Sequence, residues 1–267
     1  MEIHLNPRLT QAHQAAILKY SRNPRALQKD EWVTALAAFD LLSACRVVRE
    51  GKSQTFAQFY EEFVDRSYAT AFLSDLLAMN DAEGEGMRRA EEIKTQLLAD
   101  LRASGLLEPL TAEQRLLMAY CIYWWVAFAK GYITEVAIFQ DLTRSGIVFQ
   151  AHDLSQFSER FSPDDLTVSG MRGDIKSSTY FLHSARHFPL KHDFYIAALY
   201  DPQLRQQRRV VIMQPDAWDK IDGDPLVAEL EQAVALLPQP VKVLVKGQGL
   251  VVVEYNLWKE KILALQQ

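Results

Sequence analysis

Four charged side chains lie close together in the stretch SPDDLTVSGMRGDIKSSTYFL, and these are Asp164, Asp165, Asp174 and Lys176. Many of their neighbours are β-branched or apolar, which indicates two short strands joined by a turn. Carboxylates are the hard oxygen ligands that Mg²⁺ and Mn²⁺ prefer, and a nearby lysine can stabilise charge that develops on a phosphate. The stretch is therefore a candidate divalent-metal site.

The position of the turn decides whether two of these carboxylates meet. With the loop at residues 171–172, Asp165 and Asp174 would lie too far apart along the strands to share one ion. With Ser169 and Gly170 as the loop, Asp165 faces Asp174, and directly opposed residues have Cβ atoms about 4.5–5.5 Å apart. Ser-Gly suits a type I′ turn, so we expect this second register.

The same register separates apolar from charged side chains on the hairpin. The apolar side chains on one face are Leu166, Val168, Met171 and Ile175. Asp165, Asp174 and Lys176 share the other face, which must meet solvent, a metal ion or a substrate. The alternative is a solvated hairpin in which Lys176 and Arg172 neutralise the acids in a surface salt-bridge network.

These motifs resemble the PD-(D/E)xK nuclease superfamily, whose restriction-endonuclease-like fold includes Holliday-junction resolvases. The "PD" element is matched by Pro163-Asp164 or by the adjacent Asp165, and the "(D/E)xK" element by residues 174–176. Upstream, KGYITEVAIFQDLTRSGIVFQAHD resembles the first helix of the resolvase-like members, with Glu135 as the helix acid. Helix, strand, "PD" strand and "DIK" strand follow in the family's order.

The resemblance implies a mixed sheet flanked by helices and a nuclease that hydrolyses DNA in preference to RNA. It implies Mg²⁺ or Mn²⁺ as cofactor. The ligands would be Asp165, Asp174 and Glu135, with Asp164 as the alternative "PD" acid, and the same acids together with Lys176 would form the catalytic set. The resemblance covers residues 130–200. The family usually has a substantial helix after the lysine-bearing strand, and in this sequence only residues 183–193 separate that strand from the next one.

Basic residues follow the "DIK" motif and are candidates for nucleic-acid contact. Residues 172–209 contain seven Lys or Arg and three acids, a local excess of +4 in a chain whose net charge is −5. We expect Arg172, Arg186 and Lys191 to contact phosphates. The histidines of this region, His183, His187 and His192, are expected on loops or the surface. His152 lies near the proposed site but has no predicted role.

The chain is expected to form two domains, residues 1–110 and 111–267. Apolar residues recur three and four positions apart in 29–50, 53–80 and 90–105, which predicts an all-helical first domain of unknown role. We expect this helical half to recognise a protein partner or to mediate self-association.

The second domain is expected to open with helices and continue as a sheet of α+β or α/β type. Thr111 and Gln114 have capping-box spacing, which predicts a helix that ends near Gly131 and a second, shorter one from Thr134 to Gly146. β-branched and aromatic runs then predict strands within 146–152, 165–170, 174–182, 193–200, 208–214 and 241–255, with one helix within 225–237.

Composition restricts the class of protein. The 267 residues are 49% hydrophobic and 24% charged, which excludes disorder. The most apolar run, residues 116–129, is shorter than the roughly 20 residues that span a bilayer, so no membrane segment is expected. Cys45 and Cys121 are far apart, which favours a reduced, cytoplasmic setting. The alternative function is a catalytically inactive nuclease-like fold that binds nucleic acid or protein.

Overall fold

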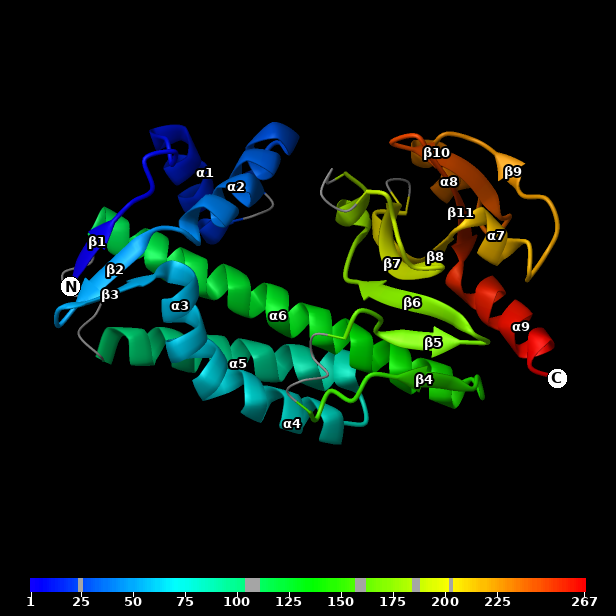
Figure 1. Ribbon diagram of the computed structural model, residues 1–267, viewed down its shortest axis with the longest axis horizontal. Helices are drawn as coiled ribbons and strands as arrows, with labels where there is room; N and C mark the ends of the chain where they lie inside the picture. Colours follow the sequence, from blue (N-terminus) through cyan, green and yellow to red (C-terminus); the bar gives the residue numbers. More distant parts are fainter. Residues whose placement is uncertain (24–25, 104–110, 157–161, 184–187, 202–203) are drawn as a thin grey trace. The chain divides into compact units, whose positions relative to one another are not determined.

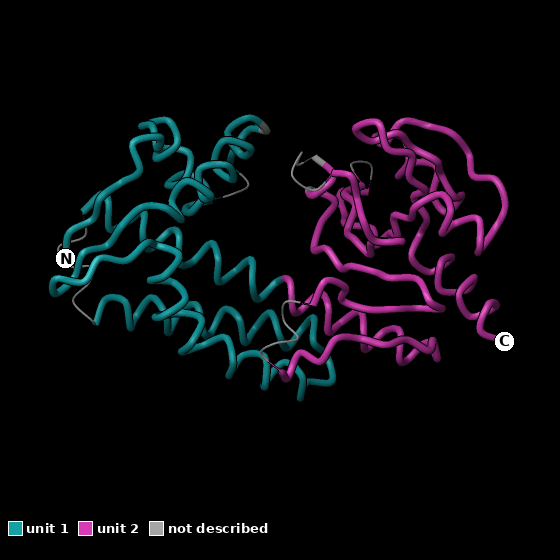
Figure 2. The backbone as a smooth tube through the Cα atoms, in the orientation of Figure 1, with its two compact units in different colours: residues 1–130 teal, residues 131–267 magenta. Residues whose placement is uncertain are grey.

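The computed structural model describes residues 1–23, 26–103, 111–156, 162–183, 188–201 and 204–267. The chain divides into two compact units, residues 1–130 and 131–267 (Figure 2). The division lies within one long helix, α6 (Ala112–Arg144), and not in the segment before it, where the sequence placed the boundary.

Unit 1 is mainly helical, as predicted, but it also contains a small sheet. Its helices before α6 are α1 (Gln11–Arg22), α2 (Lys29–Leu42), α3 (Phe56–Tyr60), a π-helix (Glu61–Ala69), α4 (Thr70–Ala78) and α5 (Ala82–Ala103). Its antiparallel strands are β1 (Glu2–His4), β2 (Arg46–Arg49) and β3 (Lys52–Thr55). The prediction of an all-helical domain was wrong because these strands are short and carry charged residues in place of an apolar alternation.

Helix α6 begins where the sequence predicted, but it does not stop at Gly131. Gln114 N–H donates to Thr111 Oγ1 at 3.2 Å and Thr111 N–H to Gln114 Oε1 at 2.8 Å, the expected capping box. The helix then continues through Thr134 to Arg144, so the predicted break was wrong. A glycine inside a helix costs only about 1 kcal/mol, less than the burial of neighbouring apolar residues contributes.

Helix α6 is the one helix, among the residues that the structure describes, that is long and apolar enough to cross a membrane. In its most apolar window 44% of the residues are buried inside the protein. Trp125, Ile138 and Leu142 are fully buried on it. Length and composition alone do not distinguish a membrane span from a core helix.

Unit 2 is built on an eight-stranded mixed sheet in the order β4-β5-β6-β7-β8-β11-β10-β9 (Figure 1). The strands in that order are β4 (Phe149–Ala151), β5 (Leu166–Val168), β6 (Met171–Lys176), β7 (Phe194–Asp201), β8 (Gln206–Met213), β11 (Gln248–Glu254), β10 (Val241–Val245) and β9 (Leu226–Val227). Strand β6 pairs parallel with β7 and β9 parallel with β10, and the other neighbours are antiparallel. The predicted mixed sheet is confirmed.

Each face of this sheet has its own apolar core. One core joins the sheet to α6, α7 (Pro215–Trp218) and α9 (Tyr255–Leu265), and Phe194, Trp218 and Trp258 are buried in it. The other joins the sheet to α8 (Leu230–Leu236) and to a 3₁₀ helix (Thr179–His183). Alternate residues of β7, β8 and β11 enter the two cores, so these central strands are apolar on both faces.

The start of the outer strand β4 is hydrogen-bonded to the side chain of Gln266. Gln266 Nε2 donates to the Val148 carbonyl at 2.8 Å, and Val148 N–H donates to Gln266 Oε1 at 2.9 Å. The same amide nitrogen donates to Ser169 Oγ at 3.2 Å. Gln266 therefore ties the start of β4 to the β5–β6 turn.

Candidate metal and phosphodiester site

The hairpin formed by β5 and β6 turns at Ser169 and Gly170, as predicted. Both residues have positive φ, 50° and 76°, which is the conformation of a type I′ turn. Leu166 therefore pairs with Gly173 and Val168 with Met171. The alternative turn at residues 171–172 is excluded.

The two faces of the hairpin are sorted as the sequence indicated. Four apolar side chains enter the core that contains α6 and α9, and these are Leu166, Val168, Met171 and Ile175. Asp174 and Lys176 alternate with them, and in the parallel register with β7 they pair with Tyr195 and Ala197 of the opposite core. The sheet thus carries an acid and a lysine on one face.

Asp165 reaches Asp174 through its side chain, because the regular ladder ends one residue earlier. Asp165 N–H donates to the Gly173 carbonyl at 3.0 Å, an irregular pairing of the kind found in β-bulges. The carboxylate then crosses toward β6, where Oδ2 accepts from Ile175 N–H at 2.6 Å and the Asp165 carboxyl is hydrogen-bonded to Asp174. The predicted contact between the two acids is present.

Helix α6 brings a third carboxylate to this point. Glu135 Oε2 lies 3.2 Å from Nε2 of His152, which follows β4. His152 N–H also donates to the Asp165 carbonyl at 3.1 Å and so extends the β4–β5 ladder by one pair. Glu135, His152 and Asp165 each offer a ligand atom within 4.8 Å of one another. Glu135 thus lies where the sequence predicted, beside Asp165.

The proximity of these acids perturbs Asp165. Burial, the negative charge of Glu135 and the negative charge of Asp174 together raise the pKa of Asp165 to about 8. The hydrogen bond from Ile175 N–H lowers the pKa, but it does not offset these causes. A carboxyl that resists ionisation because it is buried, and because other carboxylates lie beside it, is in an environment that favours a bound cation.

Lys176 compensates only part of this charge. Its Nζ lies 2.6 Å from Asp174 Oδ2, and its side chain is 35% exposed. Among the described residues, no basic side chain forms an ion pair with Asp165, and Arg172 is exposed on the hairpin and does not neutralise it. A salt-bridge network of Lys176 and Arg172 therefore does not account for the cluster.

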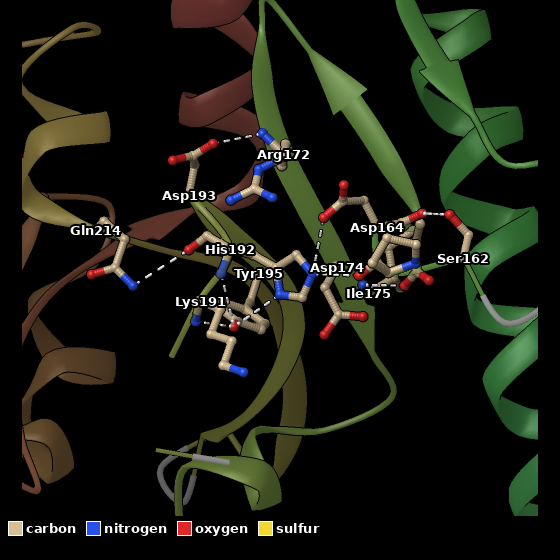
Figure 3. Close-up of polar contacts among 12 residues, drawn as sticks. Ser162, Asp164, Arg172, Asp174, Ile175, Lys191, His192, Asp193, Tyr195 and Gln214 are labelled. Atoms are coloured by element: carbon tan, nitrogen blue, oxygen red, sulfur yellow. Dashed lines mark hydrogen bonds and ion pairs between the residues drawn. The ribbon is translucent and has the colours of Figure 1, made fainter. Parts of the chain in front are cut away.

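The neighbouring acid, Asp164, has a different partner. Asp164 Oδ1 lies 3.2 Å from His192 Nε2, which also lies 2.6 Å from the Pro163 carbonyl (Figure 3). On the other side of the ring, His192 Nδ1 lies 3.0 Å from Tyr195 Oη. Asp164 is thus not among the grouped ligand atoms of Glu135, His152 and Asp165.

The hydrogen bonds around His192 define its tautomer. Tyr195 Oη accepts from the main-chain N–H groups of Lys191 and His192, so its own hydrogen is left to donate to His192 Nδ1. Nε2 must then carry the hydrogen that the Pro163 carbonyl accepts. His192 therefore holds the "PD" segment against the start of β7.

The candidate nucleic-acid contacts are only partly described. Arg172 and Lys191 are exposed, and the Arg172 main-chain N–H donates to Asp193 Oδ2 at 2.7 Å. Arg186 lies outside the described residues, as does His187. Further along the basic stretch, Arg208 lies 3.8 Å from Asp201 and Arg209 stacks on Tyr255. These two arginines are engaged in the fold.

Sequence reasoning missed two histidines. His152 and His192 both contact acids of the motif, although His192 was expected only on a loop or at the surface, and it does lie on a loop, while His152 had no predicted role. The signal for His152 was its place at the end of a predicted strand, where the ends of neighbouring strands gather. His192 gave no such signal, because its contacts depend on the parallel pairing of β6 with β7.

The residues fit a divalent ion by their chemistry. Glu135, Asp165 and Asp174 supply oxygen ligands, and the raised pKa of the Asp165 carboxyl reflects its burial and the negative charges beside it, which a cation would offset. Comparison with family models, with curated proteins and with solved structures finds no match to this chain. The chemistry of the site is therefore the basis for a functional proposal.

Proposed function

We propose that the protein is a divalent-metal-dependent nuclease that hydrolyses phosphodiester bonds, with DNA a better substrate than RNA. The observation that carries the proposal is the grouping of Glu135 with Asp165, whose carboxyl is hydrogen-bonded to Asp174 beside the amine of Lys176. Their mutual repulsion is relieved most directly by a divalent ion. These are also the residues that the resemblance to the PD-(D/E)xK superfamily implies, in the same chain order.

In this proposal a bound Mg²⁺ or Mn²⁺ supplies a Lewis acid that polarises the phosphodiester and lowers the pKa of a water molecule. Asp165 and Asp174 hold the ion from adjacent strands, and Glu135 adds an oxygen ligand from α6. The ammonium of Lys176 is partly exposed next to Asp174, so it stabilises negative charge on the phosphate as the bond breaks.

The surroundings of the site fit a nucleic-acid substrate in the cytoplasm. Arg172 and Lys191 are exposed and positively charged, so they can contact phosphates of the backbone. Arg186 is proposed for the same role on its sequence alone. Cys45 and Cys121 are free and buried, as in proteins of reducing compartments. We assign unit 1 to a protein partner or to self-association.

The experiment is cleavage of single-stranded, double-stranded and branched DNA, and of RNA, with Mg²⁺ or Mn²⁺. Asp174→Asn and Lys176→Met are expected to lower the rate at least about 100-fold, because the first removes a ligand of the ion and the second removes positive charge at the reacting phosphate. A matched control is Asp222→Asn, since Asp222 forms an exposed pair with Lys261 at 2.7 Å and is distant in sequence from the motif. The control should cleave at the wild-type rate.

Absence of cleavage by the wild-type chain in both ions would reject the enzyme. If nucleic acid or a protein partner still bound, the same fold would be a catalytically inactive binding module, as the sequence alternative holds. Equal loss of rate in Asp222→Asn would show that general destabilisation, and not the site, governs activity.

A further inference from the structure

The residue that the motif does not explain is His152. Its side chain is only 4% exposed, and that of its partner Glu135 is 13% exposed. Buried histidines next to a carboxylate are either hydrogen-bond partners that orient it or metal ligands. Which of the two applies depends on the third group that the pair faces.

The third group is Asp165, which belongs to the proposed ion site. His152 is fixed next to it, because the His152 N–H donates to the Asp165 carbonyl as the last pair of the β4–β5 ladder. The ring packs edge-on against Phe139 of α6, with ring centroids 6.1 Å apart. Main chain and packing therefore orient the imidazole independently of Glu135.

The donor atoms have the spacing of ligands around one ion. Adjacent ligands about 2.1 Å from an octahedral ion lie about 3.0 Å apart, and opposite ligands lie about 4.2 Å apart. His152 Nε2 and Glu135 Oε2 are separated by 3.2 Å, and the donor atoms of the three residues all lie within 4.8 Å. The 4.8 Å limit exceeds the separation of opposite ligands by about 0.6 Å, so the side chains would close by up to this distance to share one centre.

We propose that His152 is an imidazole ligand of this ion and that it makes the site prefer Mn²⁺ to Mg²⁺. The inference rests on the proposed ion site and names the metal that the site selects. Mg²⁺ demands oxygen ligands and gives up its waters reluctantly, whereas first-row transition ions bind imidazole nitrogen well. One nitrogen among carboxylates therefore raises affinity for Mn²⁺ more than for Mg²⁺.

The experiment is calorimetric titration of the metal-free full chain with MnCl₂ and, separately, with MgCl₂. The wild type is expected to bind Mn²⁺ at least about 10-fold more tightly than Mg²⁺. His152→Asn keeps a polar side chain that can contact Glu135, so it is expected to lose about 10-fold in Mn²⁺ affinity while Mg²⁺ affinity changes little.

The matched control is His4→Asn. His4 also contacts a glutamate, with Nε2 3.4 Å from Glu2 Oε1, but this pair is exposed and belongs to unit 1. The control should leave both affinities unchanged. If His152→Asn weakens both ions equally, or neither, His152 only orients Glu135 and the proposal is wrong.

A second measurement needs no variant. Pulsed electron paramagnetic resonance of Mn²⁺ bound to wild-type protein labelled with ¹⁵N-histidine should show a directly coordinated nitrogen, and its absence overturns the proposal. Failure of the nuclease is distinguishable, because selective Mn²⁺ binding without cleavage rejects only the enzyme. Absence of binding by either ion rejects both.

Discussion

Replacing Asp165 by asparagine removes the carboxyl whose ionisation the fold resists most. The pKa of Asp165 is raised from 3.8 to about 8 by burial and by the charges of Glu135 and Asp174. In the metal-free protein the folded state therefore keeps this proton at pH values where the unfolded chain has lost it. The contribution of Asp165 to the free energy of unfolding is therefore greatest below the pKa of the unfolded chain, and it is lost as the pH rises toward 8.

The magnitude follows from the size of the shift. Between the unfolded and the folded pKa of Asp165, each pH unit lowers the free energy of unfolding by about 1.4 kcal/mol. For a fully buried group, raising the pH from about 5 to 8 would lower it by about 4 kcal/mol. Asp165 is only half-buried, and water screens part of the repulsion, so we expect about 2 kcal/mol. The corresponding difference in melting temperature is about 4–8 °C.

The assay is urea denaturation of metal-free protein at several pH values in this range, with a chelator present. The wild type should lose stability as pH rises, whereas Asp165→Asn should lose less and should be more stable than the wild type at pH 8. Asp164→Asn is the matched control, since this carboxylate contacts His192 and should leave the pH dependence intact. An Asp165→Asn variant with the full wild-type slope would refute this account of the cluster.

Three further substitutions test the scaffold of the site by the free energy of unfolding. Gly173→Ala should destabilise by about 1–3 kcal/mol, since a Cβ there would lie 2.2 Å from Phe194 Cζ. His192→Ala should cost about 0.5–1.5 kcal/mol, because it removes the exposed hydrogen bond to the Pro163 carbonyl. Ser169→Asn should stabilise by up to about 1 kcal/mol, because Asn tolerates positive φ better than Ser. Each fails if denaturation shows no change or the opposite sign.

The hairpin could be predicted because its signals are local. The Ser169-Gly170 dipeptide sets the turn, and the period-two alternation from Leu166 to Ile175 sets which side chains face the core. These two features predict that Asp165 pairs directly with Asp174, but the ladder ends at Leu166 and Gly173, and the two acids meet only through their side chains. The irregular hydrogen bond of Asp165 with Gly173 could not be predicted, because the main chain adapts there to side-chain contacts.

The length of helix α6 could not be predicted, because it depends on tertiary contacts. Helix α6 continues past Gly131 because buried residues such as Trp125 and Ile138 hold both of its halves, although the local sequence favours a break.

Helix α9 was missed although its signals are local. Tyr255, Trp258 and Ile262 repeat at helical spacing, and Glu254 accepts from Leu257 N–H as an N-cap at 3.4 Å. The apolar strand just before it masked this change of period.

The amide of Gln266 has a consequence for truncation of the chain. Strand β4 is the outermost strand beside β5, and Val148, just before it, is 74% exposed. Because His152 N–H donates to the Asp165 carbonyl, alternation along β4 turns the main-chain groups of Val148 toward β5, where the Gln266 side chain both donates to them and accepts from them. Removal of Gln266 would leave both groups without this partner and would loosen the start of the outermost strand.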